Sequence, residues 1–132
     1  MQEDRTFNHT WSFKPHWFET TCGKMHYIDE GDPNGEPIVL IHGNPTWGYL
    51  YRHYIQPLVN AGYRCIVPDY LGFGLSDELP NIQENKIHKH AQRFSDLMAY
   101  LSIDNVTLIL HDWGGPTGGH WAAKNPHKIK RL

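Results

Sequence analysis

The sequence predicts an α/β fold in which helices cover a mostly parallel, doubly wound sheet. Short, continuous apolar runs are typical of strands buried on both faces; the chain has such runs at 37–41 and, apart from Thr107, at 106–110, and a further strand is expected at 64–67. A segment with helical spacing of its apolar residues follows two of these strands, at 46–61 and 86–102, and a third helix is expected from 116 onward. Alternating strands and helices predict parallel strands that are joined by crossover helices.

Two shorter strands are expected before the first buried run. Residues 17–22 and 25–29 have strand composition, and Gly23-Lys24 is a suitable tight turn between them. The Asp-Pro-Asn-Gly segment at 32–35 then ends this hairpin. After the run at 37–41, Thr46 is a candidate cap for a helix that ends at 61–62 and whose apolar positions are Trp47, Leu50, Tyr51, Tyr54 and Leu58.

The second half of the chain repeats the pattern. A glycine-rich loop at 68–77 precedes the helix at 86–102, whose apolar stripe is formed by Ile87, Ala91, Phe94, Met98 and Leu101. Pro116 is expected to begin the third helix, because the missing N–H of a proline needs no partner in a first turn. Residues 129–132 resemble the start of a further strand, so we expect a truncated chain.

The composition is ordinary for a globular protein. The formal net charge of the 132 residues is -2, which gives no broad attraction to nucleic acid or to an anionic membrane. The first twenty residues contain no apolar stretch typical of a signal peptide, and no apolar run reaches transmembrane length. Cys22 and Cys65 fall in strand-like segments and are expected to be buried free thiols, with a disulfide between them as the alternative. We expect a cytoplasmic protein without a cofactor, with a monomer as the default oligomeric state.

The segment 110–116 has the form of a nucleophile elbow, in which a reactive residue lies on a sharp turn between a strand and a helix. Asp112 occupies the reactive position, and we expect Gly114 and Gly115 to let the helix pack closely. A carboxylate is ionised at neutral pH and is suited to displacement at a saturated carbon. Asp112 is therefore the candidate nucleophile, although an aspartate here could also merely cap the helix.

Asn44 and Trp113 are candidate partners of this nucleophile. An ester formed on Asp112 requires an oxyanion hole for its hydrolysis, and the backbone N–H groups of Asn44 and Trp113 are the expected donors. Their side-chain N–H groups could hold a departing halide, because such donors strengthen their contact as negative charge develops. Packing for Trp113 and a local backbone contact for Asn44 are the alternatives; their position beside an aspartate nucleophile favours halide binding.

At these residues the sequence resembles the haloalkane dehalogenases of the α/β-hydrolase superfamily. The matching segments are HGNPTW at 42–47, VPDYLGFGLSD at 67–77 and HDWGG at 111–115. The resemblance implies that Asp112 is the nucleophile and that Asn44 and Trp113 stabilise the halide. It further implies that residues 1–132 are a partial α/β-hydrolase core domain, with a hairpin at about 17–29 and the elbow at 110–116. The cap domain, the C-terminal strands, the general-base histidine and its acid are expected to lie outside this chain.

The histidines of this chain are not expected to supply the missing base or a metal site. In this fold the acid and the histidine follow the nucleophile, but only twenty residues follow Asp112, and His120 and His127 fall on or just after the third helix. His88 and His90 are expected on a solvated helix face, without the carboxylates or cysteines of a metal site.

Other functions share this constellation. The expected reaction converts a small apolar haloalkane and water to an alcohol, a halide ion and a proton. Epoxide hydrolases use a similar aspartate elbow, but typically carry an aromatic residue in place of Asn44 and a glycine in place of Leu110. A β-lactone decarboxylase or a coelenterazine-type luciferase remains compatible with the motifs. An inactive fragment that lacks the catalytic histidine is the non-enzymatic alternative.

Overall fold

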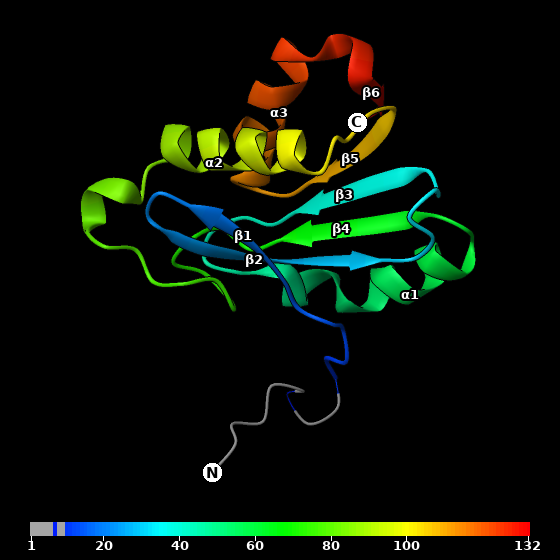
Figure 1. The fold of residues 1–132 in the computed structure, drawn as a ribbon, viewed down its shortest axis with the longest axis horizontal. Helices are drawn as coiled ribbons and strands as arrows, with labels where there is room; N and C mark the ends of the chain where they lie inside the picture. Colours follow the sequence, from blue (N-terminus) through cyan, green and yellow to red (C-terminus); the bar gives the residue numbers. More distant parts are fainter. Residues whose placement is uncertain (1–6, 8–9) are drawn as a thin grey trace.

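The computed structural model describes Phe7 and residues 10–132. Its sheet has six strands in the order β1-β2-β4-β3-β5-β6, as Figure 1 shows. The strands are β1 (His16–Thr20), β2 (Gly23–Glu30), β3 (Pro37–Ile41), β4 (Arg64–Pro68), β5 (Val106–Leu110) and β6 (Ile129–Arg131). The α-helices are α1 (Arg52–Asn60), α2 (Ile87–Tyr100) and α3 (Gly114–Lys124), and short 3₁₀ helices are η1 (Gly48–Tyr51), η2 (Ile82–Glu84) and η3 (Pro126–Lys128).

The sheet is mixed, with an antiparallel edge and a parallel centre. β2 pairs antiparallel with both β1 and β4, whereas β3 pairs parallel with β4 and β5, and β5 with β6. At the carboxyl ends of the two central strands, Ile41 of β3 is in register with Leu110 of β5. The loops that follow these two residues therefore leave the sheet side by side, which places the segments 42–47 and 111–113 next to each other.

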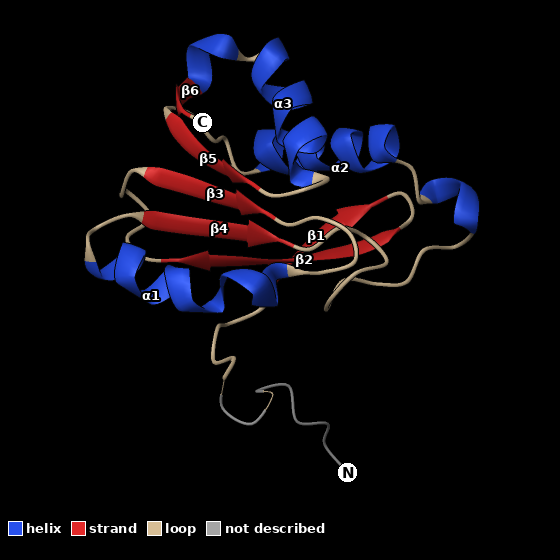
Figure 2. Cartoon of the chain, turned by 180° about the vertical axis from the view of Figure 1, so that it is seen from behind, coloured by secondary structure: helices blue, strands red, loops and turns tan. Residues whose placement is uncertain are grey.

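Helices cover both faces of the sheet. α1 lies on one face and α2 and α3 lie on the other, as Figures 1 and 2 show from opposite sides. In β3, Ile38 and Leu40 belong to the core under α1, whereas Val39 and Ile41 belong to the core under α2 and α3. Because successive residues of a strand point to opposite faces, a strand covered on both sides has no polar position, which explains its continuous apolar run.

The hairpin turn lies two residues earlier than the sequence predicted. Thr20 pairs with Gly23, so the turn consists of Thr21 and Cys22, and β2 already begins at Gly23. The Thr20 hydroxyl accepts a hydrogen bond from the Cys22 N–H at 3.1 Å and donates one to the Gly23 carbonyl at 2.7 Å. A side chain thus closes the turn. Cys22 is consequently half-buried in a turn rather than buried in a strand, whereas Cys65 is buried in β4; both are free thiols.

The start of the first helix also differs from the prediction. Residues Gly48–Tyr51 form the 3₁₀ helix η1 before α1, and the Thr46 side chain does not cap either helix. The first N–H of η1, that of Gly48, instead donates a 2.7 Å hydrogen bond to the carboxylate of Asp69, which is distant in sequence. Tyr54, predicted to face the core, is 59% exposed, and Ile55 is fully buried in its place.

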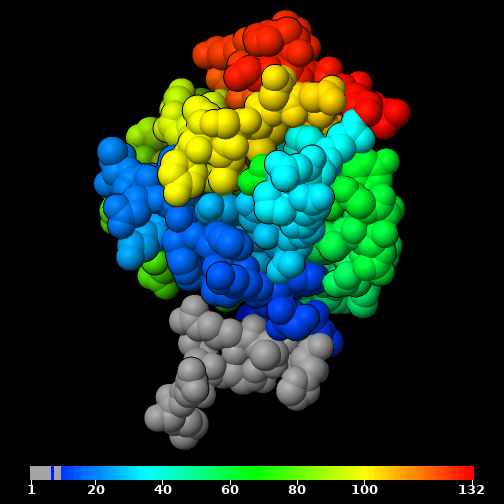
Figure 3. Space-filling view, turned by 45° about the vertical axis from the view of Figure 1, so that its right-hand side comes forward, coloured from blue at the N-terminus to red at the C-terminus, as the bar shows by residue number. Residues whose placement is uncertain are grey.

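The chain ends lie apart from each other. In Figure 3 the strand β6 and the residues after it (red) lie at the opposite end of the molecule from the first described residues of the chain (dark blue). β6 pairs parallel with β5, and it confirms the further strand expected at residues 129–132. Within the described residues, no helix is long and apolar enough to cross a membrane.

Candidate active site

Asp112 lies on a strained bend between β5 and α3. Its φ angle is +54°, a left-handed backbone conformation that is uncommon for a residue other than glycine. The bend is closed by hydrogen bonds from the Gly114 N–H to the His111 carbonyl at 2.8 Å and from the Gly115 N–H to the Asp112 carbonyl at 2.9 Å. Strain of this kind is typical of functional sites. The bend leaves the Asp112 side chain exposed at the carboxyl edge of the sheet.

Glycines on α3 allow this close packing, but not the pair that the sequence suggested. A Cβ atom on Gly114 would lie 2.4 Å from the Ile41 carbonyl oxygen of β3. A Cβ atom on Gly118, one turn later, would lie 2.5 Å from Cδ2 of Leu110. A Cβ atom on Gly115 would meet nothing within 4 Å, so the second glycine of the pair has no packing role. The helix itself begins at Gly114, two residues before Pro116, because the bend at Asp112 already sets its first turn.

The loop after β3 brings Asn44 to Asp112, 68 residues away in sequence. The backbone N–H of Asn44 donates a 3.0 Å hydrogen bond to Oδ2 of Asp112, and the peptide bond between Asn44 and Pro45 is cis. Gly43 makes this approach possible, because a Cβ atom there would lie 2.3 Å from Cβ of Asp112. The loop and the elbow are thus in direct contact.

Two backbone donors hold the carboxylate of Asp112 in its charged form. The hydrogen bond from the Asn44 N–H, and next the one from the Trp113 N–H, keep the pKa of the Asp112 carboxyl below its ordinary value. Desolvation raises this pKa, and the electrostatic effect of His111 lowers it. Asp112 is therefore an anion at neutral pH. The three residues predicted to form the site lie together, and both predicted oxyanion donors point at the same carboxylate.

The side chains predicted to bind halide differ in their surroundings. Trp113 is half-buried and packs against Phe73 and His90, with ring centroids 6.3 Å and 6.0 Å away. Asn44 is exposed beside Asp112. The Trp113 ring is thus fixed by its neighbours, whereas the Asn44 amide is free to turn.

Two histidines near the site are buried and uncharged. His42 donates from Nδ1 to the Gly43 carbonyl at 2.7 Å and accepts the Tyr70 N–H at Nε2 at 3.0 Å, and burial lowers its pKa. His90 was expected on a solvated face, but it is 1% exposed. Burial, and next the charge of Arg93, lower the pKa of His90 to about 4. Its helix face is covered because Tyr70 and Phe73 of the glycine-rich loop pack on it.

The sequence did not predict a buried hydrogen-bonded pair that lies near the site. His26 of β2 and Asp69, which follows β4, are each 1% exposed, and Nδ1 of His26 lies 2.9 Å from Oδ2 of Asp69. The only sequence signal was the position of Asp69 directly after a buried strand, where polar side chains gather in a parallel sheet. Nothing in the local sequence indicated His26.

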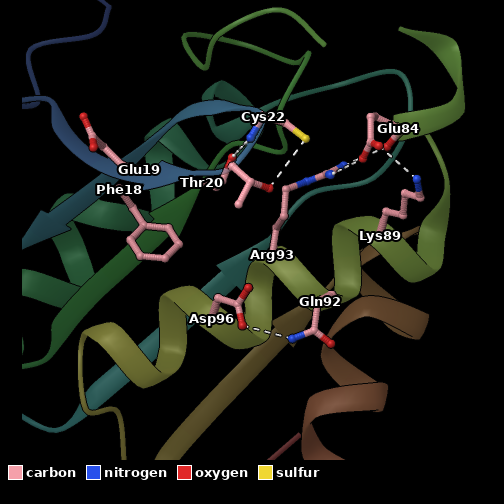
Figure 4. A pocket seen from close by; sticks show the side chains of 10 residues that line it. Phe18, Glu19, Thr20, Cys22, Glu84, Lys89, Gln92, Arg93 and Asp96 are labelled. Atoms are coloured by element: carbon pink, nitrogen blue, oxygen red, sulfur yellow. Dashed lines mark hydrogen bonds and ion pairs between the residues drawn. The ribbon is translucent and has the colours of Figure 1, made fainter. Parts of the chain in front are cut away.

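The structure also has a hollow away from Asp112. It lies between the β1–β2 turn and α2, has a volume of about 450 Å³, and is shown in Figure 4. Its wall contains an ionic group in which Glu84 accepts hydrogen bonds from Lys89 at 2.9 Å and from Arg93 at 3.2 Å. Because both basic side chains of the wall are paired with Glu84, the hollow offers no free positive charge to an anionic ligand. His120 lines another pocket, together with residues of α2 and α3.

The sequence of this chain is similar to the sequences of curated enzymes. The chain is 41% identical over 125 residues to the haloalkane dehalogenase of Mycolicibacterium paratuberculosis, covering 91% of this chain and 42% of that protein. It is 43% identical to the cis-3-alkyl-4-alkyloxetan-2-one decarboxylase of Shewanella oneidensis, covering 91% of this chain and 37% of that protein. The chain therefore spans about two fifths of the length of these curated relatives.

The chain is also similar in structure to solved α/β enzymes. The haloalkane dehalogenase DpaA of Paraglaciecola agarilytica superposes with a TM-score of 0.85 at 32% identity, covering 91% of this chain and 42% of that one. The epoxide hydrolase of Vigna radiata superposes with a TM-score of 0.79 at 30% identity, covering 89% of this chain and 38% of that one. The family model described as alpha/beta hydrolase fold matches residues 36–132, which include both loops of the candidate site. The chain belongs to the α/β hydrolase fold family.

Proposed function

We propose that the protein carrying this chain cleaves carbon–halogen bonds of haloalkanes through a covalent ester on Asp112. The observation that carries the proposal is the Asp112 carboxylate on its strained bend, with one oxygen bound by the Asn44 N–H at 3.0 Å. An exposed, ionised carboxylate needs no base to act as a nucleophile. The Asn44 N–H binds Oδ2, and Oδ1 is proposed as the oxygen that attacks.

In the first step Oδ1 of Asp112, the oxygen that does not accept the Asn44 N–H, attacks the carbon that bears the halogen. A carbon–oxygen bond forms as the carbon–halogen bond breaks, and the halide leaves with the bonding electron pair. The side-chain N–H groups of Asn44 and Trp113 are proposed to bind the halide as its charge develops. The fixed packing of Trp113 supports this role, because a donor held in place before the reaction loses little entropy on binding.

In the second step water attacks the carbonyl carbon of the ester. Oδ2 becomes the oxyanion of the tetrahedral state, and it already accepts the Asn44 N–H in the free enzyme. Collapse of this state releases the alcohol, restores the Asp112 carboxylate and leaves one proton in solution. The base that takes the proton from water, and the acid that orients this base, are proposed to lie outside these 132 residues, because His120 lies in the pocket between α2 and α3 and His127 lies in η3.

The relatives support this reaction class and also provide the rival function. Identity to the dehalogenase of M. paratuberculosis is 41%, and identity to the oxetanone decarboxylase of S. oneidensis is 43%, so overall similarity favours neither. The decarboxylation of a β-lactone releases CO₂ and no halide. Measuring both products therefore distinguishes the two functions. An epoxide hydrolase would release neither, and would be detected by diol formation.

The experiment is a halide-release assay on the complete natural protein that carries this chain, with 1-bromobutane and 1,2-dibromoethane. We expect the wild type to release bromide and Asp112→Asn to release none, because an amide is a far weaker nucleophile. Asp96→Asn is the matched control, since it alters an exposed carboxylate of α2 that accepts a hydrogen bond from Gln92. Bromide release by Asp112→Asn at the wild-type rate would exclude the covalent mechanism, and CO₂ release from a β-lactone without dehalogenation would favour the decarboxylase.

Replacing Asn44 separates its side chain from its backbone. Asn44→Ala keeps the N–H that contacts Asp112 and removes only the amide proposed to bind halide. A hydrogen bond to a charged group contributes about 1.5–3 kcal/mol, so we expect alkylation to slow by about 10- to 100-fold and ester hydrolysis to change little. Stopped-flow kinetics measure the two steps, and an unchanged alkylation rate would remove Asn44 from halide binding.

A further inference from the structure

The loop that carries the Asn44 donor is held at both ends by two consecutive residues. At its start, Nε2 of His42 accepts the backbone N–H of Tyr70 at 3.0 Å. At its end, the Gly48 N–H donates to Oδ1 of Asp69 at 2.7 Å. Asp69 and Tyr70 directly follow β4, the neighbour of β3 in the sheet. The position of Asn44 relative to Asp112 therefore depends on a segment of the chain that forms no hydrogen bond with either residue.

Asp69 is the centre of this attachment. Its carboxylate is 1% exposed and accepts three hydrogen bonds, from the Gly48 N–H, from the Leu75 N–H at 3.1 Å and from Nδ1 of His26. A buried carboxylate is costly unless it is fully hydrogen-bonded, and each of these bonds is charge-assisted. The carboxylate thus joins the Asn44 loop, the glycine-rich loop and β2 at one point.

His26 fixes the carboxylate from the other side. Because a carboxylate only accepts, Nδ1 of His26 is the donor, and its Nε2 is buried without a partner among the described residues. The backbone of His26 is attached to the same loop, since its N–H donates to the Ser76 hydroxyl at 2.8 Å and its carbonyl accepts the Asp69 N–H at 2.9 Å. The Ser76 hydroxyl in turn donates to the Asp69 carbonyl at 2.8 Å. These backbone hydrogen bonds therefore hold His26 in place beside Asp69.

Close packing leaves the Asn44 loop little freedom around Asp69. A Cβ atom on Gly48 would lie 3.0 Å from Oδ1 of Asp69. A Cβ atom on Gly74 would lie 2.6 Å from Oδ2 of Asp69 and 2.7 Å from Cβ of Trp47. The loop end, the carboxylate and the glycine-rich loop are in van der Waals contact, so a change at Asp69 is transmitted to the Asn44 loop.

We propose that the buried His26–Asp69 pair are positioning residues, which hold the Asn44 N–H at the distance from Asp112 that hydrolysis of the ester requires. This inference rests on the proposed function. The N–H of Asn44 is part of the backbone and moves with its loop, whereas the Asn44 side-chain amide can turn about its own bonds. A loosened loop therefore slows ester hydrolysis more than it slows alkylation.

The test is Asp69→Asn in the complete protein. An amide keeps the shape of the side chain, but its NH₂ group cannot accept the hydrogen bonds that one carboxylate oxygen accepts now. The matched control is Asp29→Asn, because Asp29 forms a two-bond ion pair with Arg64 between the same strands, β2 and β4, and no hydrogen bond to the Asn44 loop.

We expect ester hydrolysis to slow about tenfold in Asp69→Asn, less than the roughly 10²–10³-fold loss caused by removing an oxyanion donor, and alkylation to change less than about threefold. The ester on Asp112 then accumulates and is detected by mass spectrometry. In Asp29→Asn both steps keep their wild-type rates. A merely structural role lowers the folded fraction and leaves the ratio of the two rates unchanged, so an unchanged ratio in Asp69→Asn overturns the proposal.

A second measurement does not depend on the reaction. Amide hydrogen exchange of Asn44 and Gly48 is expected to be at least about tenfold faster in Asp69→Asn than in Asp29→Asn, with the amides of β3 unchanged. If the wild type forms no ester, the proposed function fails, and unaltered exchange at Asn44 and Gly48 would independently overturn the positioning role. Should Asp69→Asn not fold, His26→Leu removes the side-chain N–H that donates to Asp69, because leucine has no side-chain donor, and it keeps the Gly48 and Leu75 N–H bonds to the carboxylate. Faster exchange at Gly48 in His26→Leu supports the proposal, and unchanged exchange overturns it.

Discussion

Replacing Gly43 by alanine tests the contact on which the site geometry depends. The new Cβ atom would lie 2.3 Å from Cβ of Asp112 and 2.6 Å from its Oδ2. Carbon atoms in contact are about 3.5–4.0 Å apart, so the two loops must separate by about 1 Å or more. Rotation of the carboxylate can relieve the contact with Oδ2, but the contact with Cβ is relieved only by moving the backbone. Overpacking of this kind costs about 1–3 kcal/mol, and a shift of about 1 Å at a reacting group lowers the rate about 10²-fold.

The same substitution at Gly115 is the matched control. A Cβ atom at that position meets nothing within 4 Å, although it is only three residues from Asp112. Alanine in place of a helical glycine stabilises by about 0.5–1 kcal/mol. Urea unfolding and halide release are measured for both variants of the complete protein. We expect Gly43→Ala to be less stable and about 10²-fold less active, and Gly115→Ala to keep its activity. Equal stability and activity in the two variants would refute the close approach of Gly43 to Asp112.

Two further predictions concern buried polar groups. His90 has a folded-state pKa of about 4, below its ordinary value of 6.5. Between these two pH values the unfolded chain therefore binds more protons than the folded chain. The free energy of unfolding has its full value above about pH 6.5 and falls by up to about 3 kcal/mol as the pH decreases to about 4. Urea titrations of His90→Gln should show a flatter pH dependence than the wild type, and an identical slope would contradict the assignment. Tyr51 is buried and donates from its hydroxyl to the Ile41 carbonyl at 2.9 Å, and burial raises its pKa to about 12; Tyr51→Phe should lose about 1–2 kcal/mol in urea unfolding at any pH below about 10, whereas Tyr54→Phe, at an exposed ring, should lose almost nothing.

The buried strands could be predicted because their signal is contained in consecutive residues. The runs at 37–41 and 106–110 match β3 and β5 residue for residue, since a strand covered on both faces is apolar at nearly every position; Thr107 is the polar exception in β5. The bend at Asp112 was also foreseen, because small residues directly after a reactive residue are typical of an elbow. Helix ends were less predictable. Pro116 is compatible with any position in a first turn, so it does not specify where α3 begins.

Other features depend on partners that are distant in the chain. The cap of η1 comes from Asp69, not from the adjacent Thr46. The glycine that admits Leu110 is Gly118, not Gly115, because the packing is set by the crossing of α3 over the sheet. His90 carries a polar side chain and lies on α2 beside a charged residue, so its local sequence predicts exposure. It is buried because the glycine-rich loop and Trp113, which are distant in the chain, pack against it.

The sequence by itself determined the order of strands and helices, the aspartate at the elbow and the identity of the residues in the loop after β3. These are properties of short segments, in which apolar periodicity and turn chemistry act over a few residues. Only the tertiary structure decided that the Asn44 N–H meets Oδ2 of Asp112 and that His26 and Asp69 hold the loop that brings it there. The His26–Asp69 contact joins residues that are 43 positions apart in the chain, and the Asn44–Asp112 contact joins residues that are 68 positions apart. Both contacts exist because β2, β4, β3 and β5 are neighbours in the sheet, an arrangement set by the packing of the whole core.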